Sequence, residues 1–464
     1  MASPSAYGQA VKPSPARITK VLVANRGAIA RRIVRACNEL AVDSVVVFSP
    51  ADAGAPYIDE ASQSYPLSGL RPLDSYLDQD QLLQIAQQSG ADAVHPGYGF
   101  LSENPTFARR VIDAGMVFIG PDPAWLERMG DKVNARRMMA EWGMPTFAGS
   151  ELITDLAGAQ KAAAHIGFPL VVKPSGGGGG MGMQVVQSAE ELEPALERAR
   201  AVANAAFGNG DLYLERWIQK PRHIEYQILA DEFGNAMHLH ERECSVQRRH
   251  QKLIEESPAP GIDPELLRRQ AEQGASICAS LGYNNVGTLE TLYCEGETGF
   301  LEMNTRIQVE HGVTEAVTGI DLVQQQILLA AGGPLPKSAA LAGHAIEVRI
   351  YAEDWLTMMP STGVLREFQP PQLHAVRVET GYQTGQTVSP YYDALLAKVI
   401  AKGSTRAQAI GRAVVALHAF KISGVLTNVS LLLRVLQDPE FLAGNVDTGI
   451  VDRVLAASRR VTAL

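Results

Sequence analysis

The sequence predicts an α/β protein with an N-terminal doubly wound parallel sheet, a glycine-rich α/β lid and a mixed α/β C-terminal region. Short apolar strands alternate with amphipathic helices over residues 18–125, five glycines stand between two apolar strands at 169–186, and residues 300–311 alternate between apolar and polar side chains. The first pattern is typical of βαβ units. The second is typical of a loop that closes on a ligand, and the third of a half-buried strand.

The parallel sheet is expected from short apolar strands in the N-terminal part. These strands lie at 18–24, 44–48, 93–96 and 116–120, with helices expected at 80–89 and 104–114. Another helix follows the first strand, with apolar residues at Ile29, Ile33 and Ala36. The turn before it contains only Gly27, so the G-x-G-x-x-G fingerprint of dinucleotide-binding folds is absent.

A glycine-rich loop defines the lid. Residues 169–186 read as strand, loop and strand, with five consecutive glycines in the loop. Ordering five glycines has a large entropic cost, so we expect the loop to close only on a ligand, and its backbone N–H groups suit phosphate oxygens. A strand follows the glycines, so this is not a Walker A loop, and Lys173 is the expected phosphate partner. A flexible linker is the alternative.

The predicted site centres on the stretch F-L-E-M-N-T-R-I-Q-V-E-H, residues 300–311. In an extended strand, one face would carry Glu302, Asn304, Arg306, Gln308 and Glu310. A second strand is expected at 286–294, and a turn at 295–299 would bring Glu290 beside Glu302 and Asn304. Carboxylate and amide oxygens suit Mg²⁺ that shares phosphate oxygens with a nucleotide. A solvated, charged edge strand is the alternative.

The remaining elements are expected between and after these landmarks. A helix is predicted at 129–142, strands at 211–218 and 221–229, a helix at 318–331 and a strand at 343–350. Residues 241–252, reading E-R-E-C-S-V-Q-R-R-H-Q-K, concentrate cations within an acidic protein. No aromatic residues interleave with these cations, so an anionic substrate fits better than nucleic acid.

Composition narrows the class of protein. The 464 residues include 41 Lys and Arg against 50 Asp and Glu, a net charge of −9, which disfavours broad binding to nucleic acid or an anionic membrane. The four cysteines form no C-x-x-C pair, so a disulfide framework or zinc site is not expected, and a reducing, cytoplasmic location fits. Residues 1–17 lack the pattern of a signal or transit peptide and read as a disordered tail. The sequence contains no apolar run long enough for a membrane span.

Eight short motifs occur along the chain in one order. They are A-N-R-G at 24–27, H-P-G-Y-G-F-L-S-E-N at 95–104, M-G-D-K at 129–132, K-P-S-G-G-G-G-G at 173–180, P-R-H-I-E at 221–225, E-C-S-V-Q-R-R-H-Q-K at 243–252, E-M-N-T-R-I-Q-V-E-H at 302–311 and Y-Y-D at 391–393. Over about residues 18–455 the chain therefore resembles the biotin carboxylases of the ATP-grasp superfamily.

The resemblance implies how the chain is divided and what it binds. The implied parts are a tail at 1–17, an N-terminal domain at 18–130, a linker helix at 131–146, a lid domain at 147–218 and a C-terminal domain at 219–464. ATP would lie between two sheets with Mg²⁺ or Mn²⁺. Bicarbonate would be activated by ATP and transferred to biotin, with carboxyphosphate as the intermediate.

The resemblance also implies roles for individual residues. The implied ATP-binding residues are Lys132, Lys173, Gly178, Gly179, Gly180, Met183, Glu215, Arg216, Ile218, His223, Gln247, His250, Lys252, Glu290 and Glu302. The implied metal-binding residues are Glu290, Glu302 and Asn304. For the chemistry, Arg306, Gln308 and Val309 would hold bicarbonate, Lys252 would bridge bicarbonate and the γ-phosphate, Glu310 would be the base and Arg349 would face biotin.

Partners and alternatives follow from the same resemblance. No methionine in the chain is followed by lysine, as in the M-K-M hairpin of a carrier domain, so biotin is expected on a separate carrier protein. A homodimer and a partner carboxyltransferase are also implied. The alternatives are an ATP-grasp ligase for another nitrogen acceptor, which would not need Arg349, and a nucleotide-binding regulatory subunit without activity.

Three residues depart from the family's usual pattern. Met181 stands where Lys or Arg is usual, Gly312 where Pro is usual, and Ala28 where Glu is common. None of them has an implied chemical role. They leave open an altered lid closure or substrate preference. Residues His95, Tyr98, Glu103 and Cys244 also lie in family motifs, and for them a structural role is at least as well supported as a catalytic one.

Overall fold

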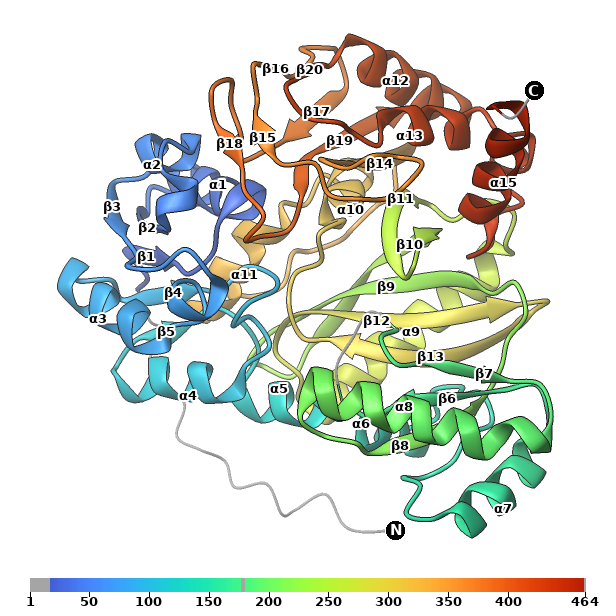
Figure 1. Ribbon diagram of the computed structural model, residues 1–464. Helices are drawn as coiled ribbons and strands as arrows, with labels where there is room; N and C mark the ends of the chain where they lie inside the picture. Colours follow the sequence, from blue (N-terminus) through green and yellow to red (C-terminus); the bar gives the residue numbers. More distant parts are fainter. Residues whose placement is uncertain (1–16, 177–179, 463–464) are drawn as a thin grey trace.

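The computed structural model describes residues 17–176 and 180–462, arranged in five sheets with helices around them (Figure 1). The N-terminal sheet is parallel, in the order β3-β2-β1-β4-β5. Its strands are β1 (Lys20–Val23), β2 (Asp43–Phe48), β3 (Gln63–Pro66), β4 (Ala93–His95) and β5 (Val117–Phe118). The predicted parallel sheet is confirmed. The edge strand β3 was not predicted, because its sequence Q-S-Y-P contains no apolar run.

Helices connect these strands. They are α1 (Gly27–Glu39), η1 (Pro50–Asp52), α2 (Pro56–Glu60), η2 (Pro72–Asp74), α3 (Gln79–Ser89), α4 (Pro105–Asp113) and α5 (Pro123–Gly130). The strand order reverses at β1, which pairs with β2 on one side and with β4 on the other. The loops that follow β1 and β4 are joined there, because Asn25 Nδ2 donates to the carbonyls of Pro96 and Tyr98 at 2.7 and 2.8 Å. Such a switch point is where open α/β sheets bind ligands.

The helix predicted at 129–142 is two helices. Helix α5 ends at Gly130, and α6 (Lys132–Glu141) begins after Asp131. The carboxylate of Asp131 caps α6 by accepting from the backbone N–H groups of Val133 and Asn134, both at 3.0 Å. The prediction of a helix start at Met129 is therefore wrong by three residues, because the capping aspartate and not the methionine sets the boundary.

The lid is a three-stranded antiparallel sheet in the order β7-β6-β8, with helices packed beside it (Figure 1). Its elements are α7 (Leu156–Ile166), β6 (Leu170–Pro174), β7 (Gln184–Val186), η3 (Ala189–Glu191), α8 (Leu192–Phe207) and β8 (Leu212–Arg216). Apolar residues of the strands and both helices form one separate core around Leu170, Val172 and Leu214. The two strands predicted on either side of the glycines are confirmed, whereas residues 177–179 of the predicted loop lie outside the described residues.

The C-terminal region is built on an eight-stranded sheet in the order β13-β12-β9-β10-β11-β14-β19-β17, with antiparallel pairs throughout. The strands are β9 (Arg222–Ala230), β10 (Ala236–Arg248), β11 (Gln251–Ser257), β12 (Asn285–Cys294), β13 (Glu297–Asn304), β14 (His344–Tyr351), β17 (Val376–Glu379) and β19 (Leu395–Gly403). The small ladders β15 (Gly363–Val364) with β18 (Thr387–Val388) and β16 (Glu367–Gln369) with β20 (Lys421–Ser423) lie outside it.

Helices pack around this sheet and join it to the N-terminal part. They are α9 (Pro264–Leu281), α10 (His311–Thr318), α11 (Leu322–Ala330), α12 (Arg406–Ala419), α13 (Val429–Leu436), α14 (Pro439–Ala443) and α15 (Ile450–Thr462). One core contains Ile29 and Ile33 of α1 together with Leu322 and Ile327 of α11, so the N-terminal sheet is fixed against the C-terminal region. Among the described residues, no helix is long and apolar enough to cross a membrane.

The strand predicted at 300–311 ends earlier than expected. Strand β13 stops at Asn304, residues 305–310 are irregular, and α10 begins at His311. The turn before β13 is also shorter than predicted, since only Glu295 and Gly296 separate β12 from β13, both with positive φ. The prediction that five polar side chains share one strand face is therefore wrong beyond Asn304. The alternation of apolar and polar residues along the sequence does not show where the backbone leaves the sheet.

Candidate active site

A cavity of about 740 Å³ lies where the loops of the N-terminal sheet, the lid and the eight-stranded sheet meet. Every described residue of the predicted site lines it. These residues are Lys132, Lys173, Gly180, Met183, Glu215, Arg216, Ile218, His223, Gln247, His250, Lys252, Glu290, Glu302, Asn304, Arg306, Gln308, Val309, Glu310 and Arg349. The predicted Gly178 and Gly179 lie outside the described residues. Segments far apart in the sequence are thus brought to one cavity.

Lys252 of β11 lies in this cavity between three carboxylates. Its Nζ is 2.6 Å from Glu225, 3.0 Å from Glu290 and 2.6 Å from Glu310. Burial disfavours the lysine's charge, but the three carboxylates outweigh burial and raise the pKa of Lys252 well above its usual value. In the same way, Lys252 and Arg349 outweigh burial and hold the pKa of Glu310 well below its usual value. Glu310 is therefore ionised and able to accept a proton.

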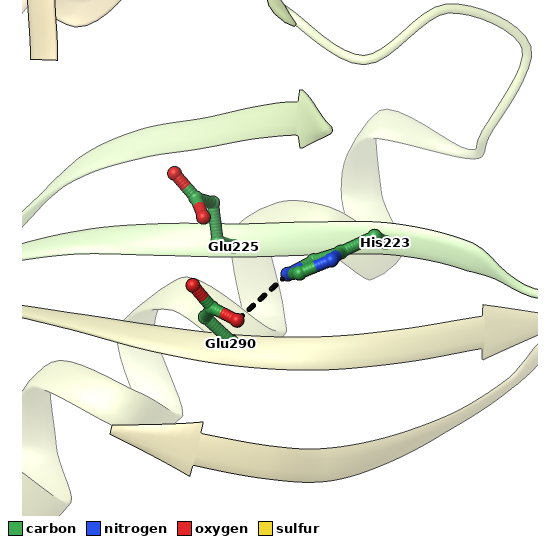
Figure 2. A group of neighbouring side chains, drawn as sticks. All are labelled: His223, Glu225 and Glu290. Carbon is green, nitrogen blue, oxygen red and sulfur yellow. Dashed lines mark ion pairs between the residues drawn. The ribbon is translucent and has the colours of Figure 1, made fainter. Parts of the chain in front are cut away.

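Two predicted metal ligands face each other across a ladder. Glu290 of β12 pairs in register with Glu302 of β13 on one side and with Glu225 of β9 on the other. Glu290 Oε2 lies 3.0 Å from His223 Nε2, as Figure 2 shows, and Glu302 Oε2 lies 2.8 Å from Lys132 Nζ. Each carboxylate therefore lies against a basic side chain of the protein.

This donor set fits a divalent cation. Glu290 and Glu302 supply hard carboxylate oxygens, and the neighbouring Glu225 adds a third, which suits Mg²⁺ or Mn²⁺. The amide oxygen of Asn304 accepts from Arg306 Nη2 at 2.7 Å, so Asn304 is oriented by the neighbouring guanidinium. Its Nδ2 atom is buried and has no hydrogen-bond partner among the described residues, so it can donate to an anionic ligand but cannot coordinate a cation.

The irregular segment 305–310 still turns its polar side chains toward one another. Arg306 Nη1 donates to Gln308 Oε1 at 2.8 Å, and Gln308 Nε2 donates to Glu290 Oε1 at 3.0 Å. Arg349 Nη2 donates to Glu310 Oε2 at 2.8 Å. Guanidinium, amide and carboxylate groups thus surround the same volume although they do not share a strand.

The lid closes the other side of the cavity. Lys173 at the end of β6 forms an ion pair with Glu215 of β8, and Arg136 Nε lies 3.4 Å from the same carboxylate. Gly180 has a φ of +70°, and a Cβ there would overlap the imidazole ring of His250. Glycine at this position is therefore required for the lid loop to meet the turn between β10 and β11.

Sequence reasoning missed residues that complete the site. Glu225 binds Lys252, and Glu103, expected to be structural, accepts from Arg306 Nε at 3.0 Å. A signal for Glu225 was available, because it lies two residues after His223 on a predicted strand and so shares its face. Glu103 gave no such signal, since its contact with Arg306 joins two irregular segments that are 203 residues apart in the sequence.

The three departures from the family pattern lie near the site. Met181 is 55% exposed on the lid, and Ala28 lines the cavity. At Gly312, a Cβ would lie 2.7 Å from Ile400 Cδ1 and 2.8 Å from Glu347 Oε2, so the ends of these side chains would have to shift for a larger residue.

Comparison with known proteins agrees with this geometry. Residues 17–126 match the biotin carboxylase N-terminal domain, 131–338 the carbamoyl-phosphate synthase L chain ATP-binding domain, and 347–453 the biotin carboxylase C-terminal domain. The chain is 44% identical to the biotin carboxylase of Halalkalibacterium halodurans, over 93% of this chain and 97% of that protein. It is 43% identical to a pyruvate carboxylase subunit of Methanothermobacter thermautotrophicus, over 94% and 89%.

A solved structure of a biotin carboxylase domain is also similar to this chain. The biotin carboxylase domain of Hydrogenobacter thermophilus 2-oxoglutarate carboxylase, a dimer in complex with MgADP, ADP and bicarbonate, superposes with a TM-score of 0.92 at 41% identity, over 94% of this chain and 98% of that one. The fold and cleft define an ATP-grasp protein. Within that class, the chain belongs to the biotin carboxylase family, and it is an enzyme that carboxylates biotin with ATP and bicarbonate.

Proposed function

We propose that Glu310, Lys252, Arg306 and Arg349 carry the two chemical steps. The observation that supports this most directly is the unbroken series of contacts from Lys252 to Glu310 to Arg349 along the cavity, at 2.6 and 2.8 Å. An ionised carboxylate held between two cations is a positioned base. The cations on either side can then stabilise anions that form next to it.

In the first step, Glu310 removes the proton from bicarbonate. A bicarbonate oxygen then attacks the γ-phosphorus of ATP, the bond from that phosphorus to ADP breaks, and carboxyphosphate forms. Arg306 and Gln308, with the backbone of Val309, hold the bicarbonate, while Lys252 lies between bicarbonate and the γ-phosphate. Because Lys252 keeps its charge in the buried site, it offsets the negative charge on the transferring phosphoryl group.

The ATP subsite follows from the remaining lining residues. Lys132, Lys173 and His223 contact the phosphates together with Gly180, and the lid glycines Gly178 and Gly179 belong to the same proposal. Glu215, Arg216 and Ile218 surround adenine, and Met183, Gln247 and His250 complete the subsite. Glu290, Glu302 and Asn304 would hold Mg²⁺ or Mn²⁺, which neutralises phosphate charge when bound.

In the second step, carboxyphosphate breaks into CO₂ and phosphate. The released phosphate removes the proton from the ureido nitrogen of biotin, which then attacks CO₂, and a C–N bond forms. The oxygen of the ureido ring becomes negative as that proton leaves. Arg349 faces this oxygen, and arginine suits the task because it stays charged and presents a rigid set of donors.

The partners are also part of the proposal. Biotin arrives on a separate carrier protein, and a carboxyltransferase subunit consumes the carboxybiotin. The support is that one relative is a subunit of pyruvate carboxylase. A homodimer is proposed from the dimeric relative. A cytoplasmic location and the domain limits given by the sequence, 18–130, 131–146, 147–218 and 219–464, remain proposals.

One assay tests the function. Purified protein is mixed with MgATP and bicarbonate, and ATP hydrolysis is measured with and without free biotin. Stimulation by biotin with formation of carboxybiotin is expected. Bicarbonate-dependent hydrolysis that biotin never stimulates would favour another nitrogen acceptor. Absence of any bicarbonate-dependent hydrolysis, with ATP still bound, would favour a regulatory subunit.

The carrier is tested with labelled bicarbonate. A biotinylated carrier protein mixed with this chain and MgATP should become labelled. Label found on this chain itself would contradict a separate carrier.

A further inference from the structure

A second carboxylate, Glu255, approaches the guanidinium of Arg349. Glu255 Oε1 lies 2.5 Å from Arg349 Nη2, the same nitrogen that donates to Glu310 at 2.8 Å. The side chain of Glu255 is 0% exposed, and within the described residues neither of its oxygens accepts a hydrogen bond. A fully buried carboxylate is costly unless it is paired, so Glu255 depends on its ion pair with Arg349.

A bulge in β11 places Glu255 there. Val246 pairs with Ile254 and Gln247 pairs with Lys252, so Leu253 is an extra residue in the ladder between β10 and β11. Regular alternation would put residues 252 and 255 on opposite faces of the sheet. The bulge instead lets Lys252 and Glu255 both reach the group formed by Glu310 and Arg349.

The shared nitrogen matters during turnover. When Glu310 takes the proton of bicarbonate, it becomes neutral and no longer balances the charge of Arg349. Glu255 lies at the same Nη2 and can then be the counter-ion. Burial raises the pKa of Glu255 to about 7, and the charge of Glu310 contributes to that rise, so a neutral Glu310 favours the ionised form of Glu255.

We propose that Glu255 is a positioning residue for biotin carboxylation: it holds the guanidinium of Arg349 toward biotin while Glu310 is protonated. This proposal rests on the proposed roles of Glu310 and Arg349. Glu255 is not among the described residues that line the cavity, and it acts through Arg349. The carboxylation of biotin should therefore depend strongly on Glu255, and the cleavage of ATP should depend on it less.

The test is the ratio of two rates measured on the purified chain. One is the formation of carboxybiotin from free biotin, MgATP and labelled bicarbonate, and the other is bicarbonate-dependent ATP hydrolysis without biotin. Glu255→Gln is expected to lower the first rate about 10-fold or more, the scale of a misplaced catalytic group, and the second rate less than about threefold. Glu255→Asp keeps the charge, so its ratio of carboxybiotin formation to ATP hydrolysis should lie between the ratios of Glu255→Gln and the unsubstituted protein.

The neighbouring Glu256 gives a matched control. It is also buried, but its Oε2 lies 2.7 Å from both His344 Nε2 and Arg406 Nε, and its Oε1 accepts from Arg406 Nη2 at 2.9 Å. Glu256→Gln should lower the melting temperature and leave the ratio of the two rates unchanged. If Glu255→Gln behaves like this control, with both rates falling in proportion, Glu255 is merely structural and the proposal is wrong.

A double-mutant cycle shows whether Glu255 acts through Arg349. In an Arg349→Gln background, Glu255→Gln should cause no further loss of carboxybiotin formation, whereas full additivity would overturn the proposal. If Glu255→Gln does not fold, Glu255→Asp takes its place in the cycle. Failure of the unsubstituted protein to carboxylate biotin would instead refute the proposed function, so the two failures are distinguishable.

Discussion

The molecule contains two buried clusters, each made of both basic and acidic side chains. One cluster adjoins the cavity, and the other is enclosed by the protein. The cleft cluster consists of Lys252, Glu290, Glu310 and Arg349, which line the cavity, and Glu225, which is buried behind them and pairs with Lys252. The sealed cluster, Arg32, Glu315, Glu347, Glu379 and Lys398, lies beneath segment 305–310, and all its side chains are at most 4% exposed. None of the sealed residues is among those that line the described cavity.

The sealed cluster joins parts of the chain that are far apart. Arg32 of α1 lies 2.8 Å from Glu315 of α10, and Lys398 of β19 lies 2.8 Å from Glu379 of β17. Lys398 Nζ also donates to the carbonyl of Val309 at 2.5 Å. The sealed cluster is thus held together by ion pairs within the protein, and Lys398 fixes the backbone of the segment 305–310 at Val309.

The pKa values of the carboxyl groups depend on how closely a cation approaches each of them. In the sealed cluster, Arg32 outweighs burial and lowers the pKa of Glu315 to about 2. At Glu347, burial raises the pKa to about 8, and the nearby Lys398 offsets that rise only in part. In the cleft cluster, Lys252 holds Glu310 ionised. Similar residues therefore position the chain in the sealed cluster and have the proposed chemical roles in the cleft cluster. The physical reason is that, of the two clusters, the cleft cluster adjoins the cavity.

The largest effect is expected from breaking the sealed cluster. Lys398→Met leaves Glu379 without its closest cation and removes the donor to Val309. Losing one partner of a buried ion pair costs about 3–5 kcal/mol, so the free energy of unfolding should fall by that amount in chemical denaturation. Lys402→Met, half-buried on the same strand, is the control and should cost less than about 0.5 kcal/mol. Equal stability of the two variants would contradict the comparison.

Breaking the cleft cluster should cost activity rather than stability. Glu310→Gln keeps the shape of the side chain but removes the base, so bicarbonate-dependent ATP hydrolysis should fall by roughly 10²-fold or more. Binding of MgATP, measured by calorimetry, should remain. A nearly normal rate would remove Glu310 from the role of base.

A smaller effect is expected at the edge of the cleft. Glu302→Gln removes one of the proposed metal ligands and leaves Lys132 with a weaker partner, so the Mg²⁺ concentration needed for half-maximal activity should rise by at least about 10-fold. Glu297→Gln, at the exposed end of β13, is the control and should not change it. If added Mg²⁺ restores no activity although the protein is folded, Glu302 is more than a ligand.

The smallest effect is expected on the exposed lid, beyond both clusters. Met181→Arg adds a charge near the phosphates, but solvent screens it, so ATP affinity should improve by roughly 2–30-fold and kcat should stay within a few-fold. KM for ATP and kcat at saturating bicarbonate are the measurements. Val185→Arg, on the outer side of β7, should change neither. A gain of about 100-fold in kcat would instead indicate that the native lid is inactive and favour the regulatory alternative.

The sequence by itself determined the parts of the molecule that local geometry controls. The apolar strands of the N-terminal sheet and the glycine-rich loop were identified correctly, because strand and turn patterns reflect nearby backbone preferences. The pairing of Glu290 with Glu302 was also correct, since a short hairpin fixes the register of its own strands.

Only the tertiary structure decided which charges meet. The end of β13 at Asn304, the bulge at Leu253 and the contact between Lys398 and Val309, 89 residues apart, leave no trace in local alternation. A bulge moves every later side chain to the other face, and a contact between distant strands depends on the order of strands in the sheet. The residue types of the site were therefore readable from the chain, whereas the counter-ions that position them were set by the fold.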